Sequence, residues 1–172
     1  MSARDRILAV IRERQGKAGE PAGHELEAVR SHLAAHPRNA APRDAWEPLT
    51  RFRERALSLA STIDEAQTLS DVPARVASYL RERELPMSAV CWRELEALDW
   101  AAAGVTTEVR AARGDDLVGI TGAFCAISET GTLMMLSGRD TPPTVSLLPE
   151  THIAVVRRER VVRSMEDAWT LL

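Results

Sequence analysis

Cysteine is scarce in this chain, which contains only Cys91 and Cys125 among its 172 residues. The two lie far apart and form no C-x-x-C pair. Because zinc and iron–sulfur sites take about four ligands, we expect no metal site within this sequence. Both cysteines sit in apolar runs, which predicts small buried thiols. So few cysteines are typical of a reducing compartment, and we therefore expect a cytoplasmic protein.

Long hydrophobic runs and an excess of basic residues are also missing. No run reaches the length of about 18 residues that a membrane span needs, and no signal-peptide core is recognisable. The 22 Lys and Arg residues are outnumbered by 25 Asp and Glu, which gives a net charge of −3. Nucleic-acid binding favours a clustered basic face. We therefore expect neither membrane insertion nor a nucleic-acid partner.

The residue pattern divides the chain into a helical N-terminal extension, residues 1–43, and an α/β domain, residues 44–172. In the extension, Ser2 and Asp5 form a capping-box pattern ahead of one helix, and a second helix is predicted over residues 24–35. The glycine- and proline-containing segments between these helices and the domain predict loops.

In the domain, predicted helices alternate with short β-like segments. The helices are residues 44–59, a segment opened by Ser70, and a last segment capped by Ser164 and Asp167. The β-like segments are residues 61–66, 88–92, 105–109, a pair within 123–136, and 152–156. This alternation predicts an α/β fold with a largely parallel sheet.

The most informative stretch is LVGITGAFCAISETGTLMML, residues 117–136, in which Glu129 is the only charged residue. Its S-E-T-G-T turn predicts a hairpin. A buried carboxylate without a partner is costly, so Glu129 either caps the turn or serves a site as a general base, a nucleophile or a hydrogen-bond acceptor. The turn also offers Thr130, Gly131 and Thr132 as candidate ligand-binding residues.

Three further positions are candidates. Residues 115–122, which include Thr121 and Gly122, predict either a tight turn leading into the hairpin or a backbone that a ligand can approach closely. His152 is expected at the start of a strand, as a catalytic group or a structural one. Arg139 lies in a Gly- and Pro-containing loop, where it would bind a carboxylate or phosphate or remain solvated.

Two linked motifs identify a family. The run D-L-V-G-I-T-G-A-F-C-A-I-S-E-T-G-T-L-M-M-L, followed by S-L-L-P-E-T-H-I-A-V-V, resembles the lactate-utilisation (LUD-type) domain family, specifically the lactate utilisation protein C family. The strong match covers residues 115–157. Residues 44–110, with D-V-P-A-R-V-A-S-Y-L-R-E-R-E-L-P, match more loosely.

The resemblance implies a three-layer fold similar to the ribose-5-phosphate isomerase and coenzyme A transferase group, with helices flanking the sheet. It also implies a subunit of a three-part system that oxidises L-lactate to pyruvate. In that system a partner subunit carries the iron–sulfur clusters, and this subunit carries no cofactor. Glu129 and His152 are the catalytic candidates, and a small organic acid is the implied ligand.

The sequence departs from the family pattern in two places. Thr144 stands where members often carry an arginine before S-L-L-P, which leaves Arg139 as the nearby substitute. Many members also continue into a segment of the type G-P-S-x-T-A-D-I-E after the last helix, and the printed sequence has none.

Two alternatives stay open beside the subunit role. Coenzyme A transferases place a nucleophilic glutamate in an S-E-x-G turn, so Glu129 would form an acyl anhydride while backbone amides near Gly122 stabilise the oxyanion; a folate ligase is a related alternative. Otherwise, the chain would be a module that binds a hydroxy or keto acid through Arg139 or His152.

Overall fold

The computed structural model describes residues 2–17, 21–35 and 45–172. The chain divides into two compact units, Met1–Ala40 and Ala41–Leu172, which we describe separately. The predicted boundary between residues 43 and 44 lies outside the described residues. Within the described ranges, no helix is long and apolar enough to cross a membrane.

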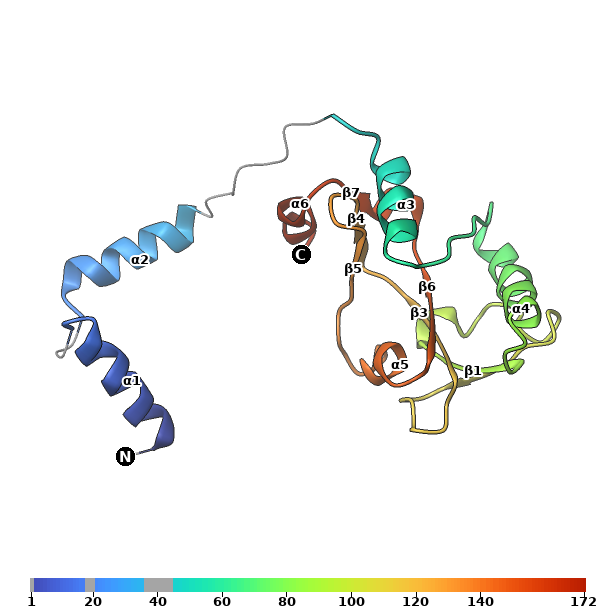
Figure 1. Ribbon diagram of the computed structural model, residues 1–172, viewed down its shortest axis with the longest axis horizontal. Helices are drawn as coiled ribbons and strands as arrows, with labels where there is room; N and C mark the ends of the chain where they lie inside the picture. Colours follow the sequence, from blue (N-terminus) through green and yellow to red (C-terminus); the bar gives the residue numbers. More distant parts are fainter. Residues whose placement is uncertain (1, 18–20, 36–44) are drawn as a thin grey trace. The chain divides into compact units, whose positions relative to one another are not determined.

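The first unit contains the helices α1 (Ala3–Arg14) and α2 (Gly23–Ala35) (Figure 1). The Ser2 hydroxyl accepts a hydrogen bond from the Asp5 N–H at 3.2 Å, and the Asp5 carboxylate accepts one from the Ser2 N–H at 2.9 Å. This confirms the predicted capping box. Neither helix buries a described residue.

The second unit contains two sheets and several helices. Its strands are β1 (Ser88–Cys91), β2 (Thr106–Val109), β3 (Val118–Gly122), β4 (Cys125–Ile127), β5 (Thr132–Met134), β6 (Thr151–Val155) and β7 (Val161–Val162). Its α-helices are α3 (Pro48–Ser58), α4 (Val72–Glu82), α5 (Thr144–Leu147) and α6 (Met165–Thr170). Its short 3₁₀ turns are η1 (Leu69–Asp71), η2 (Arg93–Leu95) and η3 (Arg158–Arg160).

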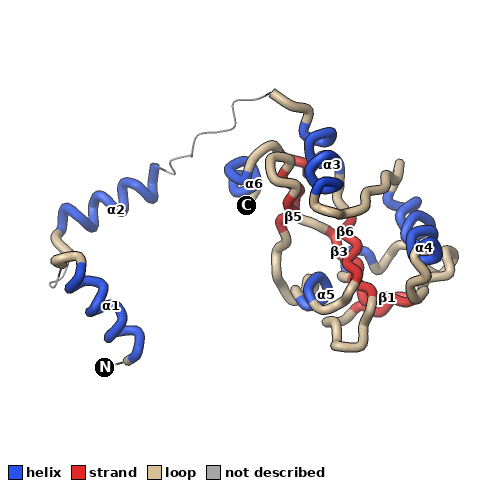
Figure 2. The backbone as a smooth tube through the Cα atoms, viewed as in Figure 1, coloured by secondary structure: helices blue, strands red, loops and turns tan. Residues whose placement is uncertain are grey.

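The larger sheet has the order β2-β1-β3-β6, and all of its strands are parallel. The smaller sheet has the order β5-β4-β7, in which β4 pairs antiparallel with β5 and parallel with β7. Figure 2 shows these strands surrounded by helices. The predicted α/β fold, a parallel sheet flanked by helices, is therefore confirmed, and so is the hairpin within residues 123–136.

Helices α4 and α5 cover opposite faces of the larger sheet. Val118 and Ile120 of β3 pack in one apolar cluster with Leu80 of α4. Successive residues of a strand point to opposite faces, so Gly119 faces the other way. There a Cβ on Gly119 would come within 2.0 Å of the Val145 carbonyl oxygen of α5. The absence of a side chain at Gly119 thus lets α5 lie directly on β3.

Three local predictions were wrong. Residues 61–66 form no strand, because they make a loop between α3 and η1. Residues 118–122, read as part of a turn or ligand loop, form the buried strand β3. The helix expected over residues 44–59 begins at Pro48, with the Glu47 carboxylate capping it through the N–H groups of Leu49 and Thr50.

We predict that Gly119→Ala destabilises the domain because the new methyl group must displace the backbone of α5. Overpacking against backbone costs roughly 1–3 kcal/mol or more. The measurement is urea unfolding of the full chain. The matched control is Gly114→Ala, where a Cβ meets no atom within 4 Å. Equal stability of the two variants would contradict the close packing of α5 on β3.

Candidate functional site

The turn at residues 128–131 closes the β4–β5 hairpin and carries the candidate Glu129. The Gly131 N–H donates to the Ile127 carbonyl at 2.9 Å, and Gly131 has a φ of +76°. Residues other than glycine rarely adopt this left-handed conformation. A Cβ on Gly131 would also lie 2.9 Å from the Cβ of Arg55 in α3. The turn therefore requires glycine for its own shape and for its contact with α3.

Hydrogen bonds to Trp46, Arg55 and Arg163 fix this turn from outside. Ser128 is fully buried, and its hydroxyl accepts from Trp46 Nε1 at 3.1 Å and donates to the Arg163 carbonyl at 3.2 Å. The Glu129 N–H donates to the same carbonyl at 3.0 Å, and Arg55 Nε donates to the Glu129 carbonyl at 3.3 Å. The backbone of Glu129 is thereby held at both its N–H and its carbonyl.

The carboxylate of Glu129 is half-buried and has no hydrogen bond or ion pair among the described residues. It does not cap its own turn. Arg51 and Arg163 stack on the ring of Trp46, which bonds Ser128, with 5.5 Å and 5.1 Å between guanidinium carbon and ring centroid. Arg51 Nε is buried without a hydrogen bond. A fixed turn thus presents a carboxylate that no described residue engages.

The side chains of Thr121 and His152 contact each other between β3 and β6, and they form a second group of candidate residues beside the Glu129 turn. Thr121 Oγ1 lies 2.8 Å from His152 Nε2. Because Gly119 pairs with His152 and Thr121 with Ala154, the two side chains are diagonal neighbours on the α5 face. Thr121 is 0% exposed, so its hydroxyl contacts His152 and has no access to solvent.

His152 is exposed as a residue, yet protein atoms crowd its ring, and this partial desolvation lowers the pKa of His152 from 6.5. A lowered pKa keeps the imidazole neutral near pH 7. The contact with Thr121 leaves Nδ1 without a partner among the described residues. His152 is therefore able to accept a proton.

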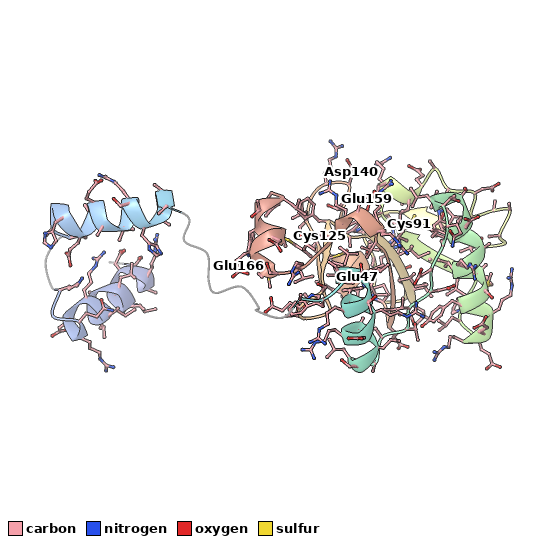
Figure 3. All side chains as sticks on the ribbon, turned by 90° about the horizontal axis from the view of Figure 1, so that it is seen from above. Glu47, Cys91, Cys125, Asp140, Glu159 and Glu166 are labelled. Atoms are coloured by element: carbon pink, nitrogen blue, oxygen red, sulfur yellow. The ribbon has the colours of Figure 1, made fainter. Side chains whose placement is uncertain are left out.

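The other candidates are spread over the domain. Thr130 Oγ1 donates to Thr132 Oγ1 at 2.8 Å on the exposed side of the hairpin. Gly122 is buried at the end of β3. Arg139 is exposed in the loop after β5, next to Asp140, which forms an ion pair with Arg93 at 2.9 Å (Figure 3). The structure thus groups Glu129 with residues 130–132 and pairs Thr121 with His152, and no described contact joins these two groups or joins either to Arg139.

Two residues at these sites were missed from the sequence. Trp46 lies before α3, within the segment predicted as helix, and its Nε1 donates to Ser128. Glu94 lies against the end of β3, where a Cβ on Gly122 would lie 2.6 Å from its carboxylate carbon. No local sequence pattern marks either residue, because each contact joins two segments that lie far apart in the sequence.

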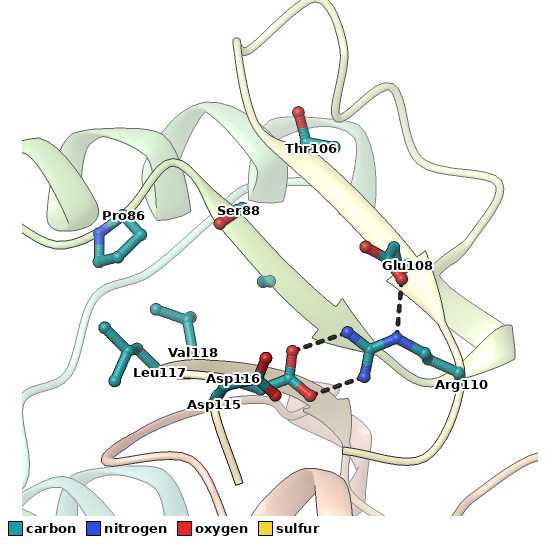
Figure 4. A pocket seen from close by; sticks show the side chains of 10 residues that line it. Pro86, Ser88, Thr106, Glu108, Arg110, Asp115, Asp116, Leu117 and Val118 are labelled. Carbon is teal, nitrogen blue, oxygen red and sulfur yellow. Dashed lines mark hydrogen bonds and ion pairs between the residues drawn. The ribbon is translucent and has the colours of Figure 1, made fainter. Parts of the chain in front are cut away.

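A small cavity of about 140 Å³ lies elsewhere, near the starts of β1 and β3. Arg110 lines this cavity and donates hydrogen bonds to both carboxylate oxygens of Asp116, at 2.6 and 2.7 Å, and to Glu108 at 2.7 Å (Figure 4). The hydrogen bonds from Arg110 to Asp116 lower the pKa of Asp116 to about 2. None of the candidate residues lines this cavity, so we interpret it as a structural ion-pair network.

Metal-ligating residues do not gather in the part of the chain that the structure describes, where no three His, Cys, Asp or Glu side chains form a potential metal site. Cys91 ends β1 and Cys125 begins β4 (Figure 3), and burial raises the pKa of both thiols. Protonated, separated thiols make a poor ligand set for an iron–sulfur cluster.

Comparison with known proteins identifies relatives. The family model for the LUD domain matches residues 3–172. Lactate utilization protein C of Anoxybacillus flavithermus is 29% identical over 96 residues, which cover 56% of this chain and 43% of that protein. Lactate utilization protein C of Bacillus licheniformis is 35% identical over 75 residues, which cover 43% of this chain and 30% of that protein. Lactate utilization protein B of Bacillus pumilus is 36% identical over 55 residues, which cover 32% of this chain and 12% of that protein. The chain thus spans less than half the length of these curated relatives.

A solved structure supports the fold. A DUF162 family protein from Deinococcus radiodurans matches with a TM-score of 0.59 at 22% identity, covering 76% of this chain and 80% of that chain. At this level of identity the likeness concerns the fold alone.

We predict that Gly131→Ala destabilises the domain by about 2–4 kcal/mol, from left-handed strain together with crowding against α3. The matched control is Gly104→Ala, because Gly104 has a φ of +78° but its nearest neighbour, an Arg81 side-chain nitrogen, is 3.7 Å away. Gly104→Ala should be destabilised by the left-handed strain alone, which costs about 1–2 kcal/mol. Urea unfolding measures both variants, and an equal loss would argue against the α3 contact.

A second prediction concerns the pH dependence of stability. Because the pKa of His152 is lower in the folded state than its usual 6.5, the unfolded chain binds the proton more readily. Stability is therefore lost as pH falls through about 6.5 and below. We expect His152→Gln to lose less stability than the wild type between pH 7.5 and 5.5, measured by urea unfolding. His24→Gln, at an exposed position of α2, should behave as the wild type does.

Proposed function

This chain belongs to the LUD domain family, and we propose that it serves lactate utilisation as a subunit beside an iron–sulfur partner, carrying no cluster itself. The observation that carries the proposal is the family match over residues 3–172, together with relatives named lactate utilization proteins C and B. The reaction proposed for the whole system is the oxidation of L-lactate to pyruvate in the cytoplasm.

The need for a partner follows from the chemistry. Converting lactate to pyruvate removes two electrons and two protons, so an electron acceptor is required. The sequence contains two cysteines, fewer than the about four thiolates of an iron–sulfur cluster. We therefore place the electron-accepting cluster on a partner subunit and the handling of the small organic acid on this chain.

The turn at Glu129 suits that handling. Hydrogen bonds to Arg163 and Arg55 fix the Glu129 backbone, whereas its carboxylate has no partner among the described residues. A carboxylate held this way is able to accept the hydroxyl proton of a bound 2-hydroxy acid. The acid's own carboxylate needs a cation beside it, and Arg55, whose Nε donates to the Glu129 carbonyl at 3.3 Å, is the arginine that the described contacts place at this turn.

A second candidate function uses the same free carboxylate as a nucleophile. Glu129 would attack an acyl thioester, forming an acyl anhydride and releasing the thiolate, as the S-E-T-G turn suggests by its similarity to coenzyme A transferases. The observation that favours it is again that no described residue forms a capping hydrogen bond with the Glu129 side chain. Because a resemblance in form is a weak argument for function, we rank it below the subunit role.

The subunit role predicts co-purification. The tagged full chain, used as bait in native cytosol, should bring down an iron–sulfur protein with the broad visible absorbance of such clusters. Adding the chain back to depleted extract under anaerobic conditions should restore lactate-dependent dye reduction. If the chain comes down alone and the rate does not change on its addition, the proposed role in lactate utilisation is wrong.

For Glu129 itself, we predict that Glu129→Gln lowers lactate-dependent dye reduction by about 10²-fold or more, because a general base contributes roughly 10²–10⁴-fold. Co-purification should be unchanged, since only the charge is removed. Glu159→Gln, which neutralises an exposed carboxylate in η3, is the matched control. If both variants retain the wild-type rate, the carboxylate has no catalytic role; thioester-dependent acyl exchange lost only in Glu129→Gln would instead support the second candidate.

A further inference from the structure

The hydroxyl group of Thr121 is a buried hydrogen-bond donor. Thr121 is 0% exposed, so solvent does not reach its Oγ1. Buried polar hydrogens in proteins are nearly always bonded, and the hydroxyl proton therefore requires an acceptor inside the protein. Among the residues that the structure describes, the one hydrogen bond of Oγ1 is the contact with His152 Nε2 at 2.8 Å. This contact must accordingly satisfy the donor.

Two arrangements of protons fit the distance between Oγ1 and Nε2. In the first, Nε2 carries a proton and donates it to Thr121. The Thr121 hydroxyl then has no acceptor within the described part of the chain and remains an unsatisfied donor in the interior, which is costly. In the second, Nε2 is unprotonated and accepts the hydroxyl proton of Thr121. A neutral imidazole has one N–H group, so the ring proton of His152 then lies on Nδ1.

We propose that Thr121 holds His152 as the Nδ1–H tautomer and that His152 donates this N–H to a carboxylate or carbonyl oxygen of a small organic acid. Thr121 is thus a positioning residue, because it acts through His152, and His152 is the residue that binds the acid. The choice of tautomer is independent of the proposed function, whereas the identity of the ligand as a small organic acid rests on it.

The strand register keeps the two side chains together. Val118 to Gly122 of β3 pair in parallel with Thr151 to Val155 of β6, so Thr121 and His152 are held by a continuous ladder. A ladder of this kind leaves little freedom for either backbone. The tautomer is therefore set by contacts inside the sheet, whatever packs against the outer side of β6.

A donor role also agrees with the charge state of His152. A second ring proton would enter at Nε2 and would remove the acceptor of the Thr121 hydroxyl, so the contact favours the neutral ring. Partial desolvation of the ring acts in the same direction by lowering the pKa of His152. The Nδ1 atom has no partner within the described ranges, and His152 is exposed as a residue. A neutral ring with a free N–H binds an oxygen atom without first taking up a proton.

Nitrogen NMR of the full chain with labelled histidine tests the tautomer directly, because it distinguishes a protonated ring nitrogen from an unprotonated one. At a pH of about 8 an imidazole with a pKa near 6.5 is neutral. We expect the Nδ1–H form of His152 to exceed the Nε2–H form by about tenfold or more, since the second form leaves a buried donor unsatisfied. Loss of signals in His152→Gln identifies them, and the exposed His24 and His32 are references in the same sample. A proton that resides mainly on Nε2 of His152 overturns the proposal.

Variants of Thr121 test its positioning role. Thr121→Val removes the hydroxyl but keeps the branched shape, and the excess of the Nδ1–H form should fall by about tenfold or more. Thr121→Ser keeps the hydroxyl and should keep the tautomer of the wild type, which separates the hydrogen bond from packing. Thr121→Ala removes the same hydroxyl and provides the measurement if Thr121→Val does not fold. If removal of the hydroxyl leaves the tautomer ratio of His152 unchanged, Thr121 does not position the ring and the proposal is wrong.

Titration with L-lactate and with pyruvate tests the ligand contact. Either acid should shift the Nδ1 signal of His152 and leave that of His24 in place. His152→Phe should weaken binding by about tenfold or more, because a hydrogen bond to a charged acceptor is lost, whereas His24→Phe should bind as the wild type does. If neither acid shifts the signal while the chain still restores lactate-dependent dye reduction, the contact is wrong and the proposed function stands. If an acid binds at His152 but dye reduction is not restored, the contact stands and the proposed function is wrong.

Discussion

The contact between α5 and β3 at Gly119 is the constraint on which the arrangement of the domain depends. The Val145 carbonyl lies where a side chain of Gly119 would be, so α5 rests directly on the central strand. From there the chain passes through Pro149 into β6, which must run beside β3. This placement brings His152 next to Thr121. A packing contact between backbones thus decides which polar side chains meet.

The second sheet uses a glycine in the same way. Gly131 lies against α3, and Ser128 joins the same turn to Trp46 and to the segment carrying Arg163. The backbone of the turn is consequently fixed from several directions, while the Glu129 side chain remains unengaged among the described residues. Because the backbone is already fixed, only the rotamers of the Glu129 side chain would remain to be ordered if a ligand bound there.

Local signals predicted local structure well. The capping boxes of α1 and α6 and the turn of the hairpin need only a few adjacent residues, and all three are present. Residues 61–66 show where such signals fail. Their composition permits a strand, but no strand pairs with them, and Asp64 and Glu65 form ion pairs with arginines instead. The pairing of Thr121 with His152 depends on strand register, which no local pattern encodes.

The exposure of His152 connects the larger sheet with the candidate site. His152 is the second residue of β6, which follows β3 in the sheet order β2-β1-β3-β6 of the described residues. Its imidazole lies on the α5 face of the sheet, beside the buried hydroxyl of Thr121. Whatever covers β6 would change the desolvation that lowers the pKa of His152. Proton uptake at this position and the covering of β6 are therefore physically coupled.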